Sequence, residues 1–185
     1  MQTATSIKDA LLNIDSITIL QLSRQYLKEL PASIGKLKNI NLLNLWLNNL
    51  TELPAEIAQL EKLMTIDISN NNFASFPEVL FSESLQHLKN INARFLQLND
   101  VPAQIGTLQQ LEYLDLTGNK LKVLPQEIGN LSQLTTLRLN QNSLTTIPDT
   151  LIKCKKLKVL HIQSNPILSR EEIQSRVPET CVIVF

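Results

Sequence analysis

The segment Leu111–Lys156 contains two consecutive copies of one 23-residue unit, LEYLDLTGNKLKVLPQEIGNLSQ and LTTLRLNQNSLTTIPDTLIKCKK. Counted from the first Leu as offset 0, apolar residues stand at offsets 0, 3, 5, 10, 13, 17 and 20, with Asn at offset 8 and Pro at offset 14. Offsets 3 and 5 have the period-2 spacing of a short strand with one buried face. A unit this small cannot bury its apolar side alone, so we predict that its copies stack into a solenoid.

Copies of the unit run through most of the chain. Pro at offset 14 suits the start of an outer segment because it lacks an N–H, so we predict a short helical or 3₁₀ turn there. We divide the chain into a capping helix (1–16), seven repeats (17–168) and a C-terminal cap (169–185). The repeats begin at Ile17, Ile40, Leu63, Leu88, Leu111, Leu134 and Leu157.

The pattern L-x-x-L-x-L-x-x-N-x-L-x-x-L-P-x-x-I-x-x-L-x-x resembles the leucine-rich repeat family. It is similar to the variant with LPxxI in its outer half, as in small bacterial and intracellular Ras-group-related repeat proteins. The resemblance covers residues 17 to 168. It implies an α/β solenoid, a leucine-rich repeat horseshoe with a concave parallel β-sheet, short helical or 3₁₀ convex segments and helical caps at both ends. It also implies protein binding on the concave face.

The two ends depart from the repeat. Ser6, followed by Asp9 three residues later, resembles a helix start, and we expect the helix to cover the open end of the first repeat. At the other end, Ser169 and Glu172 resemble a capping box for a helix that ends near Pro178. Residues 181–185 are then expected to form a short apolar strand.

A column of amides marks the turn after each strand. A buried Asn can donate to and accept from the backbone groups that are freed where the strand turns away, so we predict a structural ladder of stacked Asn side chains. Gln25 takes this place in the first repeat and is a candidate to supply the amide. The ladder members are Asn48, Asn71, Asn119, Asn142 and Asn165.

The fourth repeat is irregular. Ala93 replaces the inner Leu and Leu96 replaces the Asn, and the repeat before it has two extra residues near Phe81–Leu85. We therefore expect an interrupted ladder. Phe95, next to these changes, is expected to fill the space that Ala93 leaves.

Strand alternation predicts that offsets 2, 4 and 6 face the concave solvent, with offset 7 on the rim. Trp46, the only Trp, falls in this set. Trp, Tyr and Arg dominate interface hot spots because they bury large areas at low entropic cost. An idle surface, or a patch shielded by the N-terminal segment, is the alternative. The predicted partner-binding residues are Trp46, Asp67, Arg94, Phe95, Tyr113, Arg138 and His161.

Asp115 and Arg138 share one offset on neighbouring strands, and we expect a cross-strand ion pair between them. Asp67 and Asp115 lie two strands apart, roughly 10 Å, which is too far for one metal ion. No phosphate-binding glycine loop occurs, and no third residue stands to orient His161. We predict no enzyme activity, no metal and no cofactor.

The composition narrows the partner class. Lys plus Arg and Asp plus Glu number 17 each, so nothing favours nucleic acid or an anionic membrane surface. No apolar run approaches the roughly 20 residues that span a bilayer, and the N-terminus lacks a secretory signal. We expect a cytoplasmic protein, with a removed leader as the open alternative. Cys154 occupies a core offset, so we expect buried thiols, with a Cys154–Cys181 bridge as the alternative.

These observations predict a protein-interaction module that binds a protein partner on its concave face and is most simply a monomer. A second interpretation is a structural or self-associating repeat protein that forms a homodimer. A third is a bacterial effector, secreted to reach a host protein. None of the three interpretations names the partner.

Overall fold

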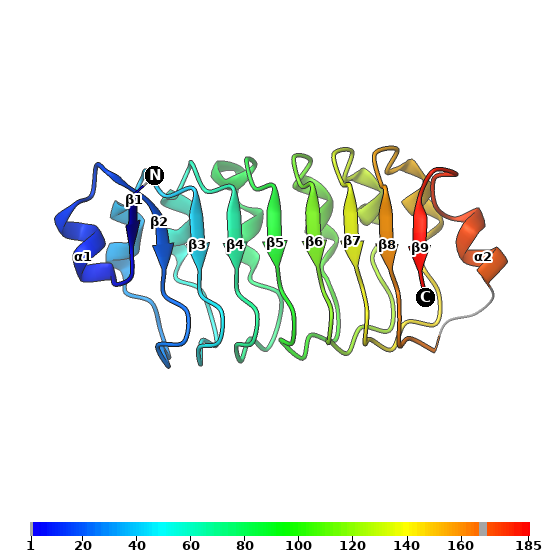
Figure 1. Ribbon diagram of the computed structural model, residues 1–185, viewed down its shortest axis with the longest axis horizontal. Helices are drawn as coiled ribbons and strands as arrows, with labels where there is room; N and C mark the ends of the chain where they lie inside the picture. The colour runs from blue at the N-terminus through cyan, green and yellow to red at the C-terminus, as the bar shows by residue number, and fades with distance from the viewer. Residues whose placement is uncertain (1, 167–169) are drawn as a thin grey trace.

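The computed structural model describes residues 2–166 and 170–185. Within these residues the strands form one parallel sheet in chain order, and Figure 1 shows them side by side along the molecule. Each strand pairs with the same offset of the next repeat, for example Leu114 with Leu137. The predicted solenoid is confirmed. The strands are β1 (Gln2–Ala4), β2 (Ile17–Gln21), β3 (Leu42–Asn44), β4 (Thr65–Asp67), β5 (Asn90–Asn92), β6 (Tyr113–Asp115), β7 (Thr136–Arg138), β8 (Val159–His161) and β9 (Val182–Val184).

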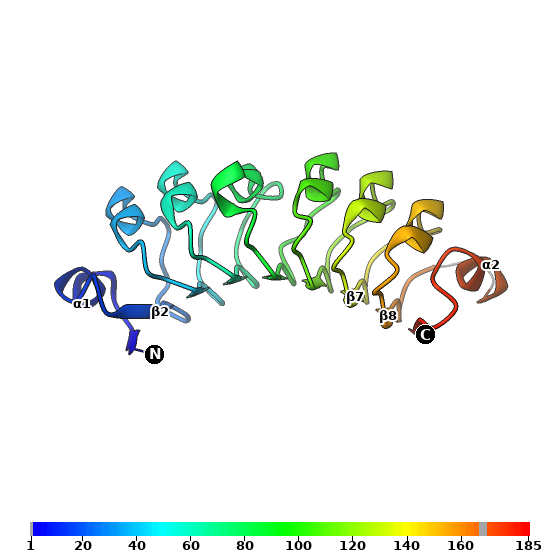
Figure 2. The same cartoon turned by 90° about the horizontal axis from the view of Figure 1, so that it is seen from above.

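The outer half of each of the first six repeats contains a 3₁₀ turn, and Figure 2 shows these turns on the convex side of an arc whose strands line the inner side. Each turn of a regular repeat begins directly after the Pro at offset 14, which has an extended backbone. The two extra residues of the third repeat accompany a second short turn. The turns are η1 (Ala32–Lys36), η2 (Ala55–Gln59), η3 (Glu78–Phe81), η4 (Glu83–Leu85), η5 (Ala103–Thr107), η6 (Gln126–Asn130) and η7 (Asp149–Lys153).

The core is a continuous column of aliphatic side chains between the strands and the 3₁₀ turns. Leu43, Leu114 and Ile128 have no solvent exposure, and the same holds at most corresponding offsets. Each buried Leu or Ile contributes about 1.5–3 kcal/mol relative to an exposed one. Cys154 is also fully buried at its Leu position, which confirms the expected apolar substitution. Both cysteines are free, so the bridge is not formed.

The Asn side chains connect neighbouring repeats. The Oδ1 atom of Asn119 accepts from the backbone N–H groups of Leu96 and Leu98 at 3.1 Å each. Its Nδ2 atom donates to the carbonyl oxygens of Ala93 at 2.9 Å and Leu116 at 2.8 Å. One amide therefore satisfies polar groups of two repeats. Equivalent bonds are made by Asn48, Asn71, Asn142 and Asn165.

The two repeats without this Asn turn differently. Gln25 does not take the ladder position: its side-chain amide donates to the carbonyl of Thr5 at 2.7 Å, because the longer side chain lies outside the core. In these repeats the residue at offset 9 adopts positive φ, 56° at Tyr26 and 61° at Gln97. The other repeats show no such value at that offset in the described chain. Loss of the Asn thus changes the backbone of the turn.

Phe95 does not fill the space beside Ala93, contrary to expectation. Its backbone has φ 53°, a left-handed value shared by offset 7 of every repeat, and this turns the side chain to the rim. The ring is 44% exposed. It lies over Gly118, where a Cβ atom would overlap it. Ala93 itself is fully buried, and Leu96 occupies a buried position at the place of the missing Asn.

A helix lies near each end of the sheet (Figure 1). Helix α1 (Ile7–Leu12) begins after Ser6, whose Oγ atom accepts from the N–H of Asp9 at 3.1 Å, and its Ala10 is buried in the common core. Strand β1 before it was not predicted. At the other end, helix α2 (Arg170–Ser175) precedes β9, which corresponds to the expected apolar strand. Ser169 lies outside the described residues.

Candidate protein-interaction surface on the concave face

The concave side chains form rows that cross the strands. The offset-4 row is fixed by the parallel register, in which Asp67 pairs with Asn92, Asn92 with Asp115, and Asp115 with Arg138. His161 follows on β8. Successive members stand about 4.8 Å apart, the spacing of neighbouring strands. A partner lying across this face would therefore meet a new repeat every 4.8 Å or so.

Trp46 projects from the end of β3 and is half-buried rather than enclosed in the core. The guanidinium carbon of Arg24 lies 4.4 Å from the centroid of its ring, within the range of a cation–π contact. Leu47 beside it is 43% exposed. We call Arg24, Trp46 and Leu47 the Trp46 cluster.

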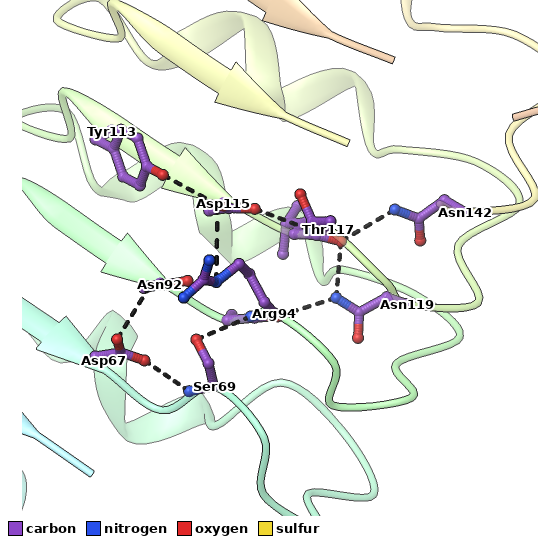
Figure 3. A network of polar contacts seen from close by, with 11 residues as sticks. Asp67, Ser69, Asn92, Arg94, Tyr113, Asp115, Thr117, Asn119 and Asn142 are labelled. Atoms are coloured by element: carbon purple, nitrogen blue, oxygen red, sulfur yellow. Dashed lines mark hydrogen bonds and ion pairs between the residues drawn. The ribbon is translucent and has the colours of Figure 1, made fainter. Parts of the chain in front are cut away.

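A second group surrounds the buried carboxylate of Asp115, which is 1% exposed (Figure 3). Its Oδ1 atom accepts from the backbone N–H of Thr117 at 3.0 Å, and its Oδ2 atom accepts from the Tyr113 hydroxyl at 3.0 Å. The Nε atom of Arg94 stands 4.0 Å from Oδ2, close enough for charge attraction but too far for a hydrogen bond. We call Arg94, Tyr113, Asp115 and Arg138 the central cluster.

The expected ion pair between Asp115 and Arg138 is not formed. The guanidinium of Arg138 instead lies over the Tyr113 ring, 5.9 Å from its centroid. Asp115 already accepts from Tyr113 and Thr117 and faces Arg94 on the opposite side. The carboxylate therefore turns away from its register partner.

Asp67 is engaged within the protein. Its Oδ1 atom accepts from the backbone N–H of Ser69 at 2.9 Å, and its Oδ2 atom accepts from the side-chain amide of Asn92 at 3.0 Å (Figure 3). The bond to the residue two positions later is the same turn-closing contact that Asp115 makes to Thr117. Asp67 thus has a structural task beside any role in binding.

Three buried polar atoms on this face have no hydrogen-bond partner among the described residues. They are the Nε atoms of Arg94 and Arg138 and the Oδ1 atom of Asn92. Buried polar groups are normally paired, and leaving one unpaired costs about 1–3 kcal/mol. The three atoms are enclosed by the protein, so a bound molecule would reach the neighbouring exposed atoms of these side chains and not the three atoms themselves.

Burial also sets the protonation of two concave groups. Desolvation, then the charge of Asp115 and the hydrogen bond to it, raises the pKa of Tyr113 to about 12. The phenol therefore stays a hydrogen-bond donor at neutral pH. Desolvation, with a smaller effect of Arg138, lowers the pKa of His161. His161 is therefore neutral at pH 7, when the nearby arginines carry the positive charge.

The structure brings together only part of the predicted site. Arg94, Tyr113 and Arg138 lie within the central cluster, while Trp46 stands apart, two residues after β3, with Asp67 on the intervening strand β4. Phe95 occupies the rim and His161 lies one strand beyond Arg138. Sequence reasoning did not select two participants, Arg24 and Asp115. Arg24 could have been found from the sequence. It lies at offset 7 of the first repeat, and Trp46 lies at offset 6 of the second, so the stacking of the two repeats brings their side chains close together.

Within the described part of the chain, no group of three or more His, Cys, Asp or Glu side chains is arranged to hold a metal ion. Two open hollows, of about 810 and 700 Å³, share His87 and Gln110 in their lining. Neither includes a residue of the Trp46 or central cluster. Among the described helices, none has the length and apolar character needed to cross a membrane.

Comparison with known families identifies the class. The leucine-rich repeat region model matches residues 94–175, and the Leucine Rich Repeat model matches residues 62–88. With the parallel solenoid and its 23-residue repeats, these matches show that the chain is a leucine-rich repeat protein. Comparison with curated protein sequences gave no significant match.

Two solved structures illustrate the similarity. The leucine-rich repeat protein LIC12759 of Leptospira interrogans is 30% identical, with a TM-score of 0.55, over 98% of this chain and 57% of that one. An internalin, inlF, of Listeria monocytogenes is 19% identical, with a TM-score of 0.78, over 98% of this chain and 51% of that one. The chain thus spans little more than half the length of either structure. The internalin similarity concerns the fold alone.

Proposed function

We propose that this protein is a non-catalytic interaction module whose concave face binds a protein partner, with contacts centred on the Trp46 cluster and the central cluster. Leucine-rich repeat proteins generally mediate protein–protein interactions. The observation that carries the proposal is that Trp46 and Arg94 lie partly exposed on the concave side and not inside the core.

Rigid display explains how such a face binds. The parallel ladder and the Asn side chains fix the backbone of each strand, so few conformations are lost when a partner docks. The cation–π contact between Arg24 and Trp46 similarly holds a large aromatic surface in place. Pre-ordered Trp, Tyr and Arg side chains can then contribute most of the binding energy.

The test compares capture of a partner by the wild type and by Trp46→Ala/Arg94→Ala. We expect the double variant to lose at least about 2 kcal/mol of binding free energy, as for hot-spot residues, and to unfold at nearly the wild-type temperature. A matched double variant on the convex surface, Lys36→Ala/Glu56→Ala, should bind normally. Unchanged partner binding by the Trp46/Arg94 variant would refute the proposed site.

A further inference from the structure

We infer that the central cluster receives a carboxylate side chain from an acidic, extended segment of the protein partner. The inference rests on the proposed function and specifies the chemistry of the partner at one place on the concave face. It is carried by the hydrogen bonds and charges on strands β5, β6 and β7.

In the part of the chain that the structure describes, the acidic side chains of the concave face are hydrogen-bonded within the protein, and the basic side chains are not. Both oxygens of Asp67 and both oxygens of Asp115 accept hydrogen bonds from within the protein. The side chains of Arg94 and Arg138 donate none that the structure records in its described part, although each guanidinium has five N–H donors. Two guanidinium groups thus flank one carboxylate whose two oxygens already accept hydrogen bonds, and the terminal N–H donors of both guanidinium groups have no recorded partner among the described residues.

A carboxylate is the group that fits this surplus. Guanidinium and carboxylate form planar, charge-assisted hydrogen bonds, which are about twice as strong as bonds between neutral groups. The half-buried position of Arg94, with 38% of its side chain exposed, reduces the screening that weakens exposed ion pairs. His161 does not compete for the anion at neutral pH, because its lowered pKa leaves it uncharged.

The partner of the proposed function is a protein, so the carboxylate belongs to an Asp or Glu side chain of a peptide segment. The Oδ1 atom of Asn92 is enclosed and does not distinguish a peptide from a free anion. Asn92 lies next to Asp115 in the register, and Asp115 lies next to Arg138, so Asn92 and Arg138 are about 10 Å apart.

The same spacing sets the length of the segment. Trp46 follows β3, and the residues of the central cluster lie on or directly after β5, β6 and β7, which is two to four strand steps, or about 10–19 Å. An extended chain advances about 3.3 Å per residue, so roughly three to six residues reach from one cluster to the other. A partner segment of about six residues is therefore long enough to contact both clusters, and a decapeptide exceeds this length.

The molecule contains a more basic surface, which provides the competing explanation. Lys153, Lys155, Lys156 and Lys158 are exposed around η7. Simple attraction of an acidic peptide to positive charge would favour this lysine group. Recognition by the central cluster would favour the two arginines, because their donors are partly buried and fixed in direction.

The experiment uses NMR of the full chain and two synthetic decapeptides, one alternating Glu with Ser and one alternating Gln with Ser. The Glu peptide is expected to shift the side-chain Nε–H signals of Arg94 and Arg138, and the Gln peptide is expected to leave them unchanged. Arg94→Gln/Arg138→Gln should weaken Glu-peptide binding at least about tenfold. The charge-matched control Lys153→Gln/Lys155→Gln should change it less than about twofold.

The inference would be overturned if both peptides shifted the arginine signals equally, or if the signals of the lysine group shifted at lower peptide concentration than those of the arginines. Displacement of the Glu peptide from the arginines by a single-stranded oligonucleotide would also overturn it. Absence of any peptide binding would overturn it as well. The proposed function is judged separately, by partner capture with the Trp46→Ala/Arg94→Ala variant. If partner capture depends on these residues but the Glu peptide causes no NMR shifts, the proposed interaction surface is supported and only the acidic segment is rejected.

Discussion

At offset 8, a single amide serves two repeats at once. Asn119 provides one acceptor for two backbone N–H groups and two donors for two carbonyl oxygens, all of them in neighbouring turns. A Leu at this place would fill the volume and leave the backbone groups unpaired. The fourth repeat shows what the chain does without the Asn, because Gln97 then adopts a positive φ of 61°.

We therefore expect Asn119→Leu to lower the free energy of unfolding by about 3 kcal/mol, since several buried backbone groups lose their partner. Asn99→Leu, an exposed position of the preceding repeat, should change it by less than about 0.5 kcal/mol. Urea unfolding of the two variants beside the wild type measures both values. Equal effects would contradict the structural importance of the ladder.

Because of Tyr113 and Asp115, the free energy of unfolding is expected to depend on pH in the alkaline range. The pKa of Tyr113 is raised from 10.0 to about 12, so the folded state holds this proton more tightly than the unfolded state. The resulting stabilisation is complete below pH 10 and is lost as the pH rises through 12.

The stability difference between the wild type and Tyr113→Phe should accordingly shrink as the pH is raised from 10 to 12. Chemical unfolding at a series of pH values measures this difference. Asp115→Asn should weaken the effect, because it removes the charge and the charged acceptor that favour the protonated phenol. A difference that stays constant across this range would show that folding does not raise the pKa of Tyr113.

At the scale of the element, the convex turns stack closely where the sequence supplies Gly at offset 18. A Cβ at Gly106 would stand 2.6 Å from the carbonyl oxygen and 2.9 Å from the Cβ of Glu127 in the next turn. The second repeat has Ala58 at this offset, and there the carbonyl oxygen of Ala58 accepts instead from the Ser84 hydroxyl in the inserted turn. The third repeat has Phe81, whose ring stacks on Phe76 at 5.4 Å.

Gly106→Ala is expected to destabilise the protein by about 1–3 kcal/mol, because backbone on the facing turn cannot yield as a flexible side chain would. Ala58→Gly, at the same offset of a looser pair of turns, should cost less than about 1 kcal/mol. Thermal unfolding of both variants gives the comparison. A neutral Gly106→Ala would mean that neighbouring convex turns separate at little cost.

For the molecule as a whole, the parallel solenoid and its 3₁₀ turns were predicted from the spacing of Leu, Asn and Pro, because each repeat buries the same positions against the next. Strand β1 was missed because residues 2–4 lack the repeat pattern and acquire their strand only by pairing with β2. The direction of Phe95 depends on a left-handed backbone that composition does not reveal. Asp115 was predicted to pair with Arg138, but its carboxylate faces Arg94. The strand register determines which residues are neighbours and does not determine the side-chain rotamer.

Trp46 is the only Trp in the chain, so it reports directly on whether a partner docks on the concave face. Protein containing fluorotryptophan gives one fluorine NMR resonance, which reports from the inner side of the arc. We predict that a stoichiometric partner shifts or broadens this resonance as its surface replaces water around the indole. A partner that binds stably, as measured by calorimetry, while the resonance keeps its position and width would contradict the account.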